Sequence, residues 1–290
     1  MIHKTLFVAD LDGTLLAPDA TLSEYSRHTL RALLAEGLLF TVATARALPS
    51  IRAILGDVAL PLPVIELNGA LVSDAATGRR VAVHALSSDV ASAVLATICD
   101  RGLSAFIATA GDEAGRLYYA QLPNPAMVWY RDEKVALADP RLRALADPRI
   151  ALAEQVVSFT LLAERDAIVA LAADVREALA DQVRLYLHEN IYCRGWWELT
   201  IQDRCASKSG AIASLRRALD LESWRLVVFG DGLNDLDMFQ VADHAVAVEN
   251  AVAEIAAIAS EIAARNDQDG VVRWLAAAMG EAQRSRHASP

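Results

Sequence analysis

The chain has 290 residues, of which 54% are hydrophobic and 22% are charged. This composition supplies a sizeable core for one large or two ordinary domains, and it is not that of a disordered chain. The formal net charge of −10 argues against a nucleic-acid partner and against attachment to anionic lipid, because both need a basic face. The three cysteines have neither disulfide-framework nor metal-ligand spacing, which favours a cytoplasmic location.

We also expect no signal peptide and no membrane partner. The N-terminal segment runs directly into a strand-like sequence, and no apolar run reaches the roughly 18–20 residues needed to span a bilayer. The alanine-rich stretch at 251–264 is interrupted by Glu254 and Glu261. That pattern predicts an amphipathic packed helix.

The N-terminal part of the chain alternates strand and helix signals. Short apolar runs at Leu6–Ala9, Leu38–Ala43 and Val64–Leu67 are typical of buried strands. Between the first two, Ser23 can cap a helix that continues to about Glu36. Strands that alternate with helices indicate βαβ units and a parallel sheet.

The middle of the chain has a different pattern, in which strand-like segments outnumber helical ones. Expected strands lie near Ser104–Thr109, Arg116–Ala120, Val156–Leu162, Val183–His188 and Tyr192–Ile201, and expected helices near Asp89–Arg101 and Arg165–Ala180. We interpret residues 85–193 as an α+β unit inserted into the first domain.

After the insertion the α/β pattern resumes. Ser207 can cap a helix through about Leu219, and buried strands are expected at Leu226–Phe229 and Ala245–Val248. The sequence therefore predicts an α/β fold in two domains. Residues 1–84 and 194–290 would form a core with a parallel sheet, and residues 85–193 would form an inserted α+β domain.

Two carboxylates directly follow the first expected strand, in the sequence Asp10-Leu11-Asp12-Gly13-Thr14. In open parallel sheets the ligand site lies beyond the carboxyl ends of the strands. One carboxylate there can act as a covalent nucleophile towards a phosphoryl group, and a second can protonate the leaving oxygen and later activate water. The alternative is a turn-forming Asp-Gly pair with a solvated carboxylate.

A second acidic segment, Gly230-Asp231-Gly232-Leu233-Asn234-Asp235, also follows an expected buried strand. If the two strands are neighbours, Asp10, Asp12, Asp231 and Asp235 converge at one edge of the sheet. Carboxylates that lie so close together raise one another's pKa, and a bound divalent cation relieves their repulsion. A set of oxygen donors without histidine or cysteine suits Mg²⁺.

Two further segments supply groups that could hold phosphate. Thr44-Ala45-Arg46 ends the second strand and offers a hydroxyl, backbone N–H groups and a guanidinium. Lys208 falls in the first turn of the helix capped by Ser207, where a cation opposes the helix dipole. This position favours a lysine that neutralises a nucleophilic carboxylate and holds a phosphate, although an exposed surface lysine is the simpler alternative.

These segments carry a resemblance to a known family. DLDGTLL at 10–16, T-A-R at 44–46, S-K at 207–208 and GDGLNDLDMF at 230–239 resemble, in order, the four motifs of the haloacid dehalogenase superfamily. Asn68-Gly69-Ala70 and the sequence NDQDGV at 266–271 resemble the Cof-type phosphatases, which have a large cap of subclass IIB between the second and third motifs. The resemblance implies a Rossmann-like core and an inserted cap domain.

The resemblance also implies an activity and a set of roles. The expected reaction is Mg²⁺-dependent hydrolysis of a small phosphomonoester, such as a sugar phosphate or related metabolite, through an aspartyl phosphate on Asp10. The implied catalytic residues are Asp10, Asp12, Thr44 and Lys208. The implied phosphate-binding residues are Ala45, Arg46, Asn68, Gly69 and Asn234. The implied Mg²⁺ site comprises Asp10, Asp12 through its backbone carbonyl, Asp231 and Asp235.

Some features are left open by the sequence. The family usually has glycine where this chain has Ala45, and alanine would be strained there if the position needs a positive φ. A phosphosugar mutase or phosphotransferase would use the same core, and an inactive binding module would have lost one of the key aspartates or Lys208. The protein is expected to be a monomer or homodimer. Cap residues are expected to select the leaving group; the candidates are Tyr118, Tyr119, His188, Arg194 and Trp196.

Overall fold

The computed structural model describes residues 4–111, 115–190 and 192–287, and the chain divides into two compact units. The core unit consists of Met1–Ala82 and Ser207–Pro290, and the inserted unit consists of Val83–Ala206. The second division therefore falls after residue 206, not between 193 and 194 as the sequence predicted. The reason is that the strand β11 (Trp197–Asp203) pairs on both sides with strands of the inserted unit.

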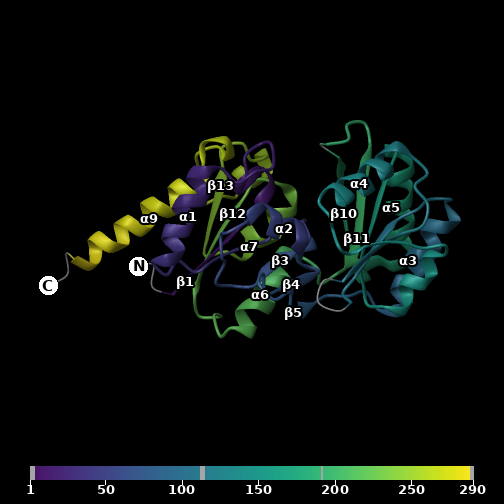
Figure 1. Cartoon of the computed structure of the whole chain (residues 1–290), viewed down its shortest axis with the longest axis horizontal. Coiled ribbons are helices and arrows are strands. Elements are labelled where there is room, and N and C mark those ends of the chain that lie inside the picture. Colours follow the sequence, from purple (N-terminus) through teal and green to yellow (C-terminus); the bar gives the residue numbers. More distant parts are fainter. Residues whose placement is uncertain (1–3, 112–114, 191, 288–290) are drawn as a thin grey trace. The chain divides into compact units, whose positions relative to one another are not determined.

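A parallel five-stranded sheet forms the centre of the core unit, in the order β14-β13-β12-β1-β2. Its strands are β1 (Thr5–Ala9), β2 (Phe40–Val42), β12 (Arg225–Gly230), β13 (His244–Val248) and β14 (Glu261–Ala263). In Figure 1, β1 in purple lies beside β12 in green, although the inserted unit separates them in sequence. A bridge between Ala43 and Ile65 continues the sheet towards β3 (Val64–Glu66). β3 is an edge strand of a three-stranded sheet in which β4 (Leu71–Ser73) lies between β3 and β5 (Arg80–Val83).

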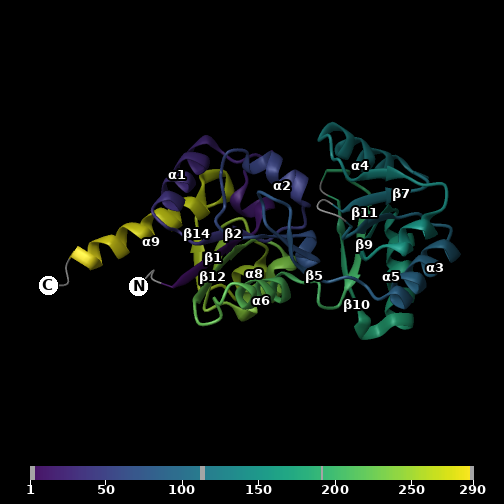
Figure 2. The ribbon, with the colours of Figure 1, turned by 60° about the horizontal axis from the view of Figure 1, so that its bottom comes forward.

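Helices cover both faces of this sheet. Alternate residues of each strand point to opposite faces, and the apolar side chains on both faces are buried against helices. Phe7, Phe229 and Val246 face one layer of helices, formed by α1 (Glu24–Ala35), α2 (Leu48–Leu55) and α9 (Gly270–His287). Leu6, Val8 and Val228 face the other layer, formed by α6 (Lys208–Ala218), α7 (Leu236–Val241) and α8 (Ala253–Ala256). Figure 2 shows α1 beside the yellow α9.

The inserted unit contains a six-stranded sheet in the order β10-β11-β9-β6-β7-β8. The remaining strands are β6 (Phe106–Thr109), β7 (Arg116–Tyr119), β8 (Leu142–Ala144), β9 (Val156–Ala163) and β10 (Val183–Glu189). Its pairings are antiparallel except for the parallel pair of β7 and β8. The helices α3 (Ser88–Asp100) and α5 (Arg165–Leu179) share an apolar core with the sheet, and α4 (Pro125–Ala136) packs against β9.

The α/β class and the parallel core sheet are as the sequence predicted. The helix expected at 251–264 is wrong: that stretch contains the short α8 and then β14, which extends the sheet by pairing with β13. Tertiary pairing outweighs the helical propensity of the alanines there. In the described part of the chain, no helix has the length and apolar character needed to cross a membrane.

Candidate active site

The two acidic segments lie side by side at the carboxyl ends of β1 and β12. The register pairs Ala9 with Phe229, and the backbone N–H of Asp10 donates to the carbonyl of Phe229 at 3.0 Å. Gly13 then turns the chain with φ of +75°, and a Cβ atom at this position would lie 2.3 Å from a carboxylate oxygen of Asp231. Only glycine therefore permits this close approach of the two segments.

Lys208 sits between two of the carboxylates. Its ammonium donates to Oδ1 of Asp10 at 2.7 Å and to Oδ1 of Asp235 at 2.6 Å, and its side chain is fully buried. Ser207 caps α6 by accepting from the backbone N–H of Gly210 at 3.0 Å, as predicted. The cap fixes the first turn of the helix, and Lys208 is its first residue. The surface-lysine alternative is therefore excluded.

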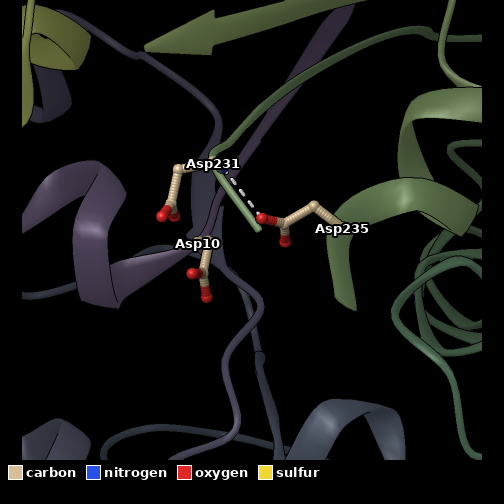
Figure 3. Close-up of side chains that lie close together, drawn as sticks. All are labelled: Asp10, Asp231 and Asp235. Carbon is tan, nitrogen blue, oxygen red and sulfur yellow. Dashed lines mark hydrogen bonds between the residues drawn. The ribbon is translucent and has the colours of Figure 1, made fainter. Parts of the chain in front are cut away.

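Asp10, Asp231 and Asp235 form one acidic cluster, in which one oxygen of each lies within 4.8 Å of the others (Figure 3). Asp231 also accepts a hydrogen bond from the hydroxyl of Thr14 at 2.6 Å. Oδ2 of Asp235 accepts from the backbone N–H groups of Asp231 at 2.9 Å and of Gly232 at 3.0 Å. Asp235 thus holds the loop after β12 as well as pairing with Lys208.

Burial and repulsion raise the pKa values of this cluster. Burial raises the pKa of Asp10 well above its ordinary value; Lys208 opposes the shift, and the neighbouring carboxylates, Asp235 first, add to it. Burial likewise raises the pKa of Asp231 to about 6, against the hydrogen bond from Thr14. The pKa of Lys208 rises despite its burial, because it has two carboxylates beside it. The cluster therefore has more negative charge than its single lysine neutralises.

The donor set fits a divalent cation. The candidate ligands that converge beside Lys208 are all carboxylates, and oxygen donors without histidine or cysteine suit Mg²⁺. Three carboxylates surround the one ammonium of Lys208, and a cation would balance the remaining negative charge of the ionised cluster. The carboxylate of Asp12 is not part of this cluster. The resemblance implied a Mg²⁺ ligand from Asp12 only through its backbone carbonyl.

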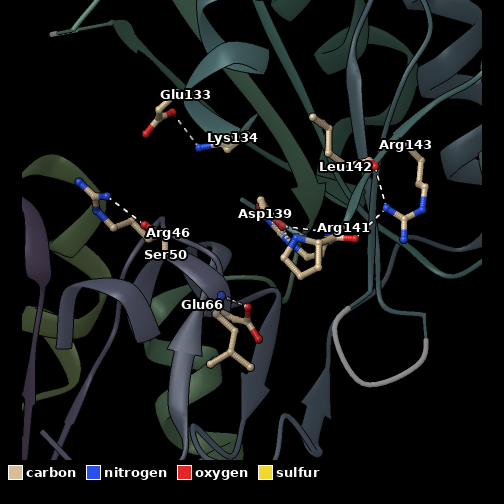
Figure 4. Close-up of polar contacts among 11 residues, drawn as sticks. Arg46, Ser50, Glu66, Glu133, Lys134, Asp139, Arg141, Leu142 and Arg143 are labelled. Carbon is tan, nitrogen blue, oxygen red and sulfur yellow. Dashed lines mark hydrogen bonds and ion pairs between the residues drawn. The ribbon is translucent and has the colours of Figure 1, made fainter. Parts of the chain in front are cut away.

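Asp12 instead forms a bidentate ion pair with Arg46. Nε of Arg46 donates to Oδ2 of Asp12 at 2.7 Å, and Nη2 donates to Oδ1 at 2.6 Å. Nη1 of the same guanidinium donates to the hydroxyl of Ser50 at 3.0 Å, a contact drawn in Figure 4. Arg46 thus fixes the orientation of the Asp12 carboxylate.

The segments after β2 and β3 form paired loops beside the carboxylates. The N–H of Asn68 donates to the carbonyl of Thr44 at 2.9 Å, and the side chain of Asn234 donates to that of Asn68 at 3.3 Å. Leu67, Asn68 and Gly69 have φ of +52°, +52° and +98°. A Cβ atom at Gly69 would lie 2.1 Å from the carbonyl oxygen of Ser207. Glycine is therefore required where this loop meets α6.

Ala45 is exposed and is not among the described residues with positive φ. Alanine is unstrained at this position, so the departure from the usual glycine does not distort the loop. Its neighbour Thr44 is fully buried, and the Thr44 hydroxyl accepts from the backbone N–H of Arg46 at 3.2 Å.

The candidate selector residues of the inserted unit have different surroundings. Tyr118 is buried and its hydroxyl donates to Glu154 at 2.7 Å, so it serves the interior of that unit. The ring of Tyr119 lies 5.8 Å from that of Phe106, and His188 is exposed on β10. Figure 4 also shows the contacts of Asp139 with Arg141 and of Glu133 with Lys134 in this unit. None of these four residues is among the candidate selectors that the sequence indicated.

The sequence also missed contributors within the core unit. Thr14 belongs to the first acidic segment. Its hydrogen bond to Asp231 could have been anticipated, because the sequence already predicted that the two acidic segments converge. Asn250 donates to the carbonyl of Gly13 at 2.8 Å and accepts from the backbone N–H of Asn266 at 2.9 Å. No local pattern marks Asn250, because its partners come from two distant segments.

Comparison with known proteins is consistent with this geometry. A family model described as haloacid dehalogenase-like hydrolase matches residues 7–275. The 5-amino-6-(5-phospho-D-ribitylamino)uracil phosphatase YitU of Bacillus subtilis is 27% identical over 93% of this chain and 96% of its own. The HMP-PP phosphatase of Cronobacter sakazakii is 27% identical over 86% of this chain and 85% of its own.

Solved structures share the fold. One described as a haloacid dehalogenase subclass IIB sugar phosphatase has a TM-score of 0.74 and 20% identity, over 93% of this chain and 97% of its own. The chain therefore belongs to the haloacid dehalogenase-like hydrolases, as a phosphatase of the Cof type.

Proposed function

We propose that this phosphatase hydrolyses a small phosphomonoester through an aspartyl phosphate on Asp10. The observation that carries the proposal is the placement of Asp10 at the end of β1, paired with a buried lysine and within 4.8 Å, ligand atom to ligand atom, of Asp231 and Asp235. A buried carboxylate with a lysine beside it is suited to approach an anionic phosphoryl group.

In the first step an oxygen of Asp10 attacks phosphorus while the bond from phosphorus to the leaving oxygen breaks. Asp12 gives its proton to that oxygen. In the second step Asp12 takes a proton from water, and the resulting hydroxide attacks phosphorus. The acyl phosphate bond then breaks, which releases phosphate and restores the carboxylate of Asp10.

Several neighbours would position and neutralise the transferring group. Lys208 would stay charged throughout and attract the phosphoryl oxygens. The hydroxyl of Thr44 and the N–H groups of the adjoining loops would donate to those oxygens. The guanidinium of Arg46 would release part of its hold on Asp12 when the substrate arrives, and its remaining donors suit a phosphate oxygen. The further candidate contacts in the same loops are Ala45, Asn68, Gly69 and Asn234.

We assign Mg²⁺ to the carboxylates of Asp10 and Asp231, with Asp235 in support and the backbone carbonyl of Asp12 as a further donor. Bound there, the ion would neutralise charge on the phosphoryl oxygens as a Lewis acid. The all-oxygen donor set and the excess negative charge of the cluster support this assignment.

For the substrate we propose a sugar phosphate or a related small metabolite. The relatives are named for a phosphorylated ribitylamino-uracil and for HMP-PP, and the structural neighbour is named a sugar phosphatase. We further propose residues 83–206 as the subclass IIB cap that selects among such leaving groups. A panel of phosphorylated metabolites, with release of inorganic phosphate as the readout, would identify the preferred one.

Removal of the metal should abolish activity. With an aryl phosphate as substrate, excess EDTA should eliminate turnover and added Mg²⁺ should restore it. Asp231→Asn should lower turnover by about 10²-fold or more, since it removes one charged metal contact. Titration calorimetry should show weaker Mg²⁺ binding by this variant.

The matched control is Asp243→Asn. Asp243 accepts from the backbone N–H of Leu226 at 2.7 Å, at the opposite end of the same sheet. This variant should keep both turnover and Mg²⁺ affinity. Full activity of the wild-type chain in excess EDTA would contradict the metal assignment.

A further inference from the structure

Glu66 is a buried carboxylate outside the acidic cluster, at the point where β3 leads into the loop that contains Asn68. Glu66 is the last residue of β3 and is 1% exposed. Its Oε1 accepts from the hydroxyl of Ser73 at 2.6 Å and pairs with Arg80. Its Oε2 accepts from the backbone N–H of Leu48 at 2.7 Å, the contact drawn beside Glu66 in Figure 4.

Through that last contact Glu66 caps the start of α2. The first N–H groups of a helix have no partner within the helix, and a negative charge there is favourable. Ala47, which precedes the helix, has no side chain that could accept. Glu66 therefore supplies from a neighbouring strand the acceptor that the local sequence lacks.

The start of α2 determines where Arg46 can lie. Arg46 stands two residues before Leu48, and its Nη1 donates to Ser50 in the first turn of the helix. Its backbone carbonyl accepts from the N–H of Leu67, the residue that follows Glu66, at 3.0 Å. Glu66 thus fixes the helix end beside Arg46 and begins the loop that is bonded to Arg46.

We propose that Glu66 is a positioning residue that acts through Arg46. It holds the first turn of α2, so that Nε and Nη2 of Arg46 reach the carboxylate of Asp12 while Nη1 reaches the hydroxyl of Ser50. Arg80 pairs with Glu66 and balances its charge inside the core unit. This inference rests on the proposed function, in which Arg46 orients Asp12 and contacts phosphate.

The test is a double-mutant cycle on kcat/KM for an aryl phosphate. Arg46→Ala should lower kcat/KM by about 10²-fold, as loss of a charge-assisted contact does. Glu66→Leu should lower it by about 10-fold, as small misplacements of a contacting group do. The double variant should be no slower than Arg46→Ala alone, because Glu66 acts only through Arg46.

Glu66→Gln provides the conservative rescue. The amide oxygen can still accept from the N–H of Leu48, so this variant should recover most of the activity lost in Glu66→Leu. If Glu66→Leu fails to fold because the partly buried Arg80 is left without Glu66, Glu66→Leu with Arg80→Leu replaces the whole pair by apolar groups. That variant should fold and show the same coupling to Arg46.

Thr41→Val is the matched structural control. The hydroxyl of Thr41 is buried on β2 and donates to the carbonyl of Pro63 at 2.6 Å. Its loss should lower the melting temperature, leave kcat/KM near that of the wild type, and add independently to Arg46→Ala.

Three results would overturn the proposal. The first is a double variant about 10³-fold slower than wild type, as independent effects would give. The second is a Glu66→Gln variant as slow as Glu66→Leu. The third is an Arg46→Ala variant with full activity, which would remove the route through Arg46 while leaving the assignments of Asp10 and Lys208 untouched.

Discussion

Asp10→Asn should lower turnover of an aryl phosphate by at least about 10⁴-fold, as loss of a covalent nucleophile does. The amide is nearly the same size as the carboxylate and can still accept from Lys208. The fold should therefore be preserved. Circular dichroism and thermal unfolding should report a native variant, and phosphate release should report an inactive one.

Asp231→Asn distinguishes loss of the nucleophile from loss of metal affinity. That variant should regain part of its turnover at high Mg²⁺, whereas Asp10→Asn should stay inactive at every Mg²⁺ concentration. If saturating Mg²⁺ restored the turnover of Asp10→Asn, Asp10 would be a metal ligand only, and the proposed nucleophile would be wrong.

Lys208→Met should damage both activity and stability. Turnover should fall by about 10²–10³-fold, because a preorganised charge contact to the phosphoryl group is lost. The variant also leaves Asp10 and Asp235 buried without their shared counter-charge. Breaking a buried ion pair by removal of one partner costs about 3–5 kcal/mol of unfolding free energy, which denaturant titration would measure.

A second substitution tests whether the loss of stability comes from uncompensated charge. Lys208→Met with Asp10→Asn removes one of the stranded carboxylates, so the double variant should be more stable than Lys208→Met alone and remain inactive. A Lys208→Met protein with the stability of the wild type would contradict the view that this ammonium neutralises the cluster.

The sequence predicted the strands of the core sheet that are short, buried apolar runs flanked by polar or turn residues, namely β1, β2, β12 and β13. It missed α4, whose buried residues are confined to Ala126 and Met127 near its first turn, so the helix has only a weak apolar stripe. It also placed the second domain boundary too early. Nothing local distinguishes a strand that belongs to the inserted sheet, as β11 does between β10 and β9, from one that returns to the core.

The candidate site was easier to predict than the domain boundary. The site residues come from three distant segments of the chain. Asp10 follows β1, Asp231 and Asp235 follow β12, and Lys208 begins α6, which packs against the same parallel sheet. Topology alone therefore brings them together. Glu66 was not found, because its significance depends on which helix end lies opposite its strand. Likewise, the pairing of Asp12 with Arg46 depends on the path of the chain around Gly13.

The most direct measurement of the central claim is the intact mass of Asp12→Asn during reaction with an aryl phosphate. A good leaving group needs no proton, so the first step should proceed. Water then lacks its general base, so a phosphoenzyme heavier by about 80 Da should accumulate with a burst of phenol. Borohydride trapping should map the adduct to Asp10, and a label on a serine or histidine, or no adduct at all, would contradict the account.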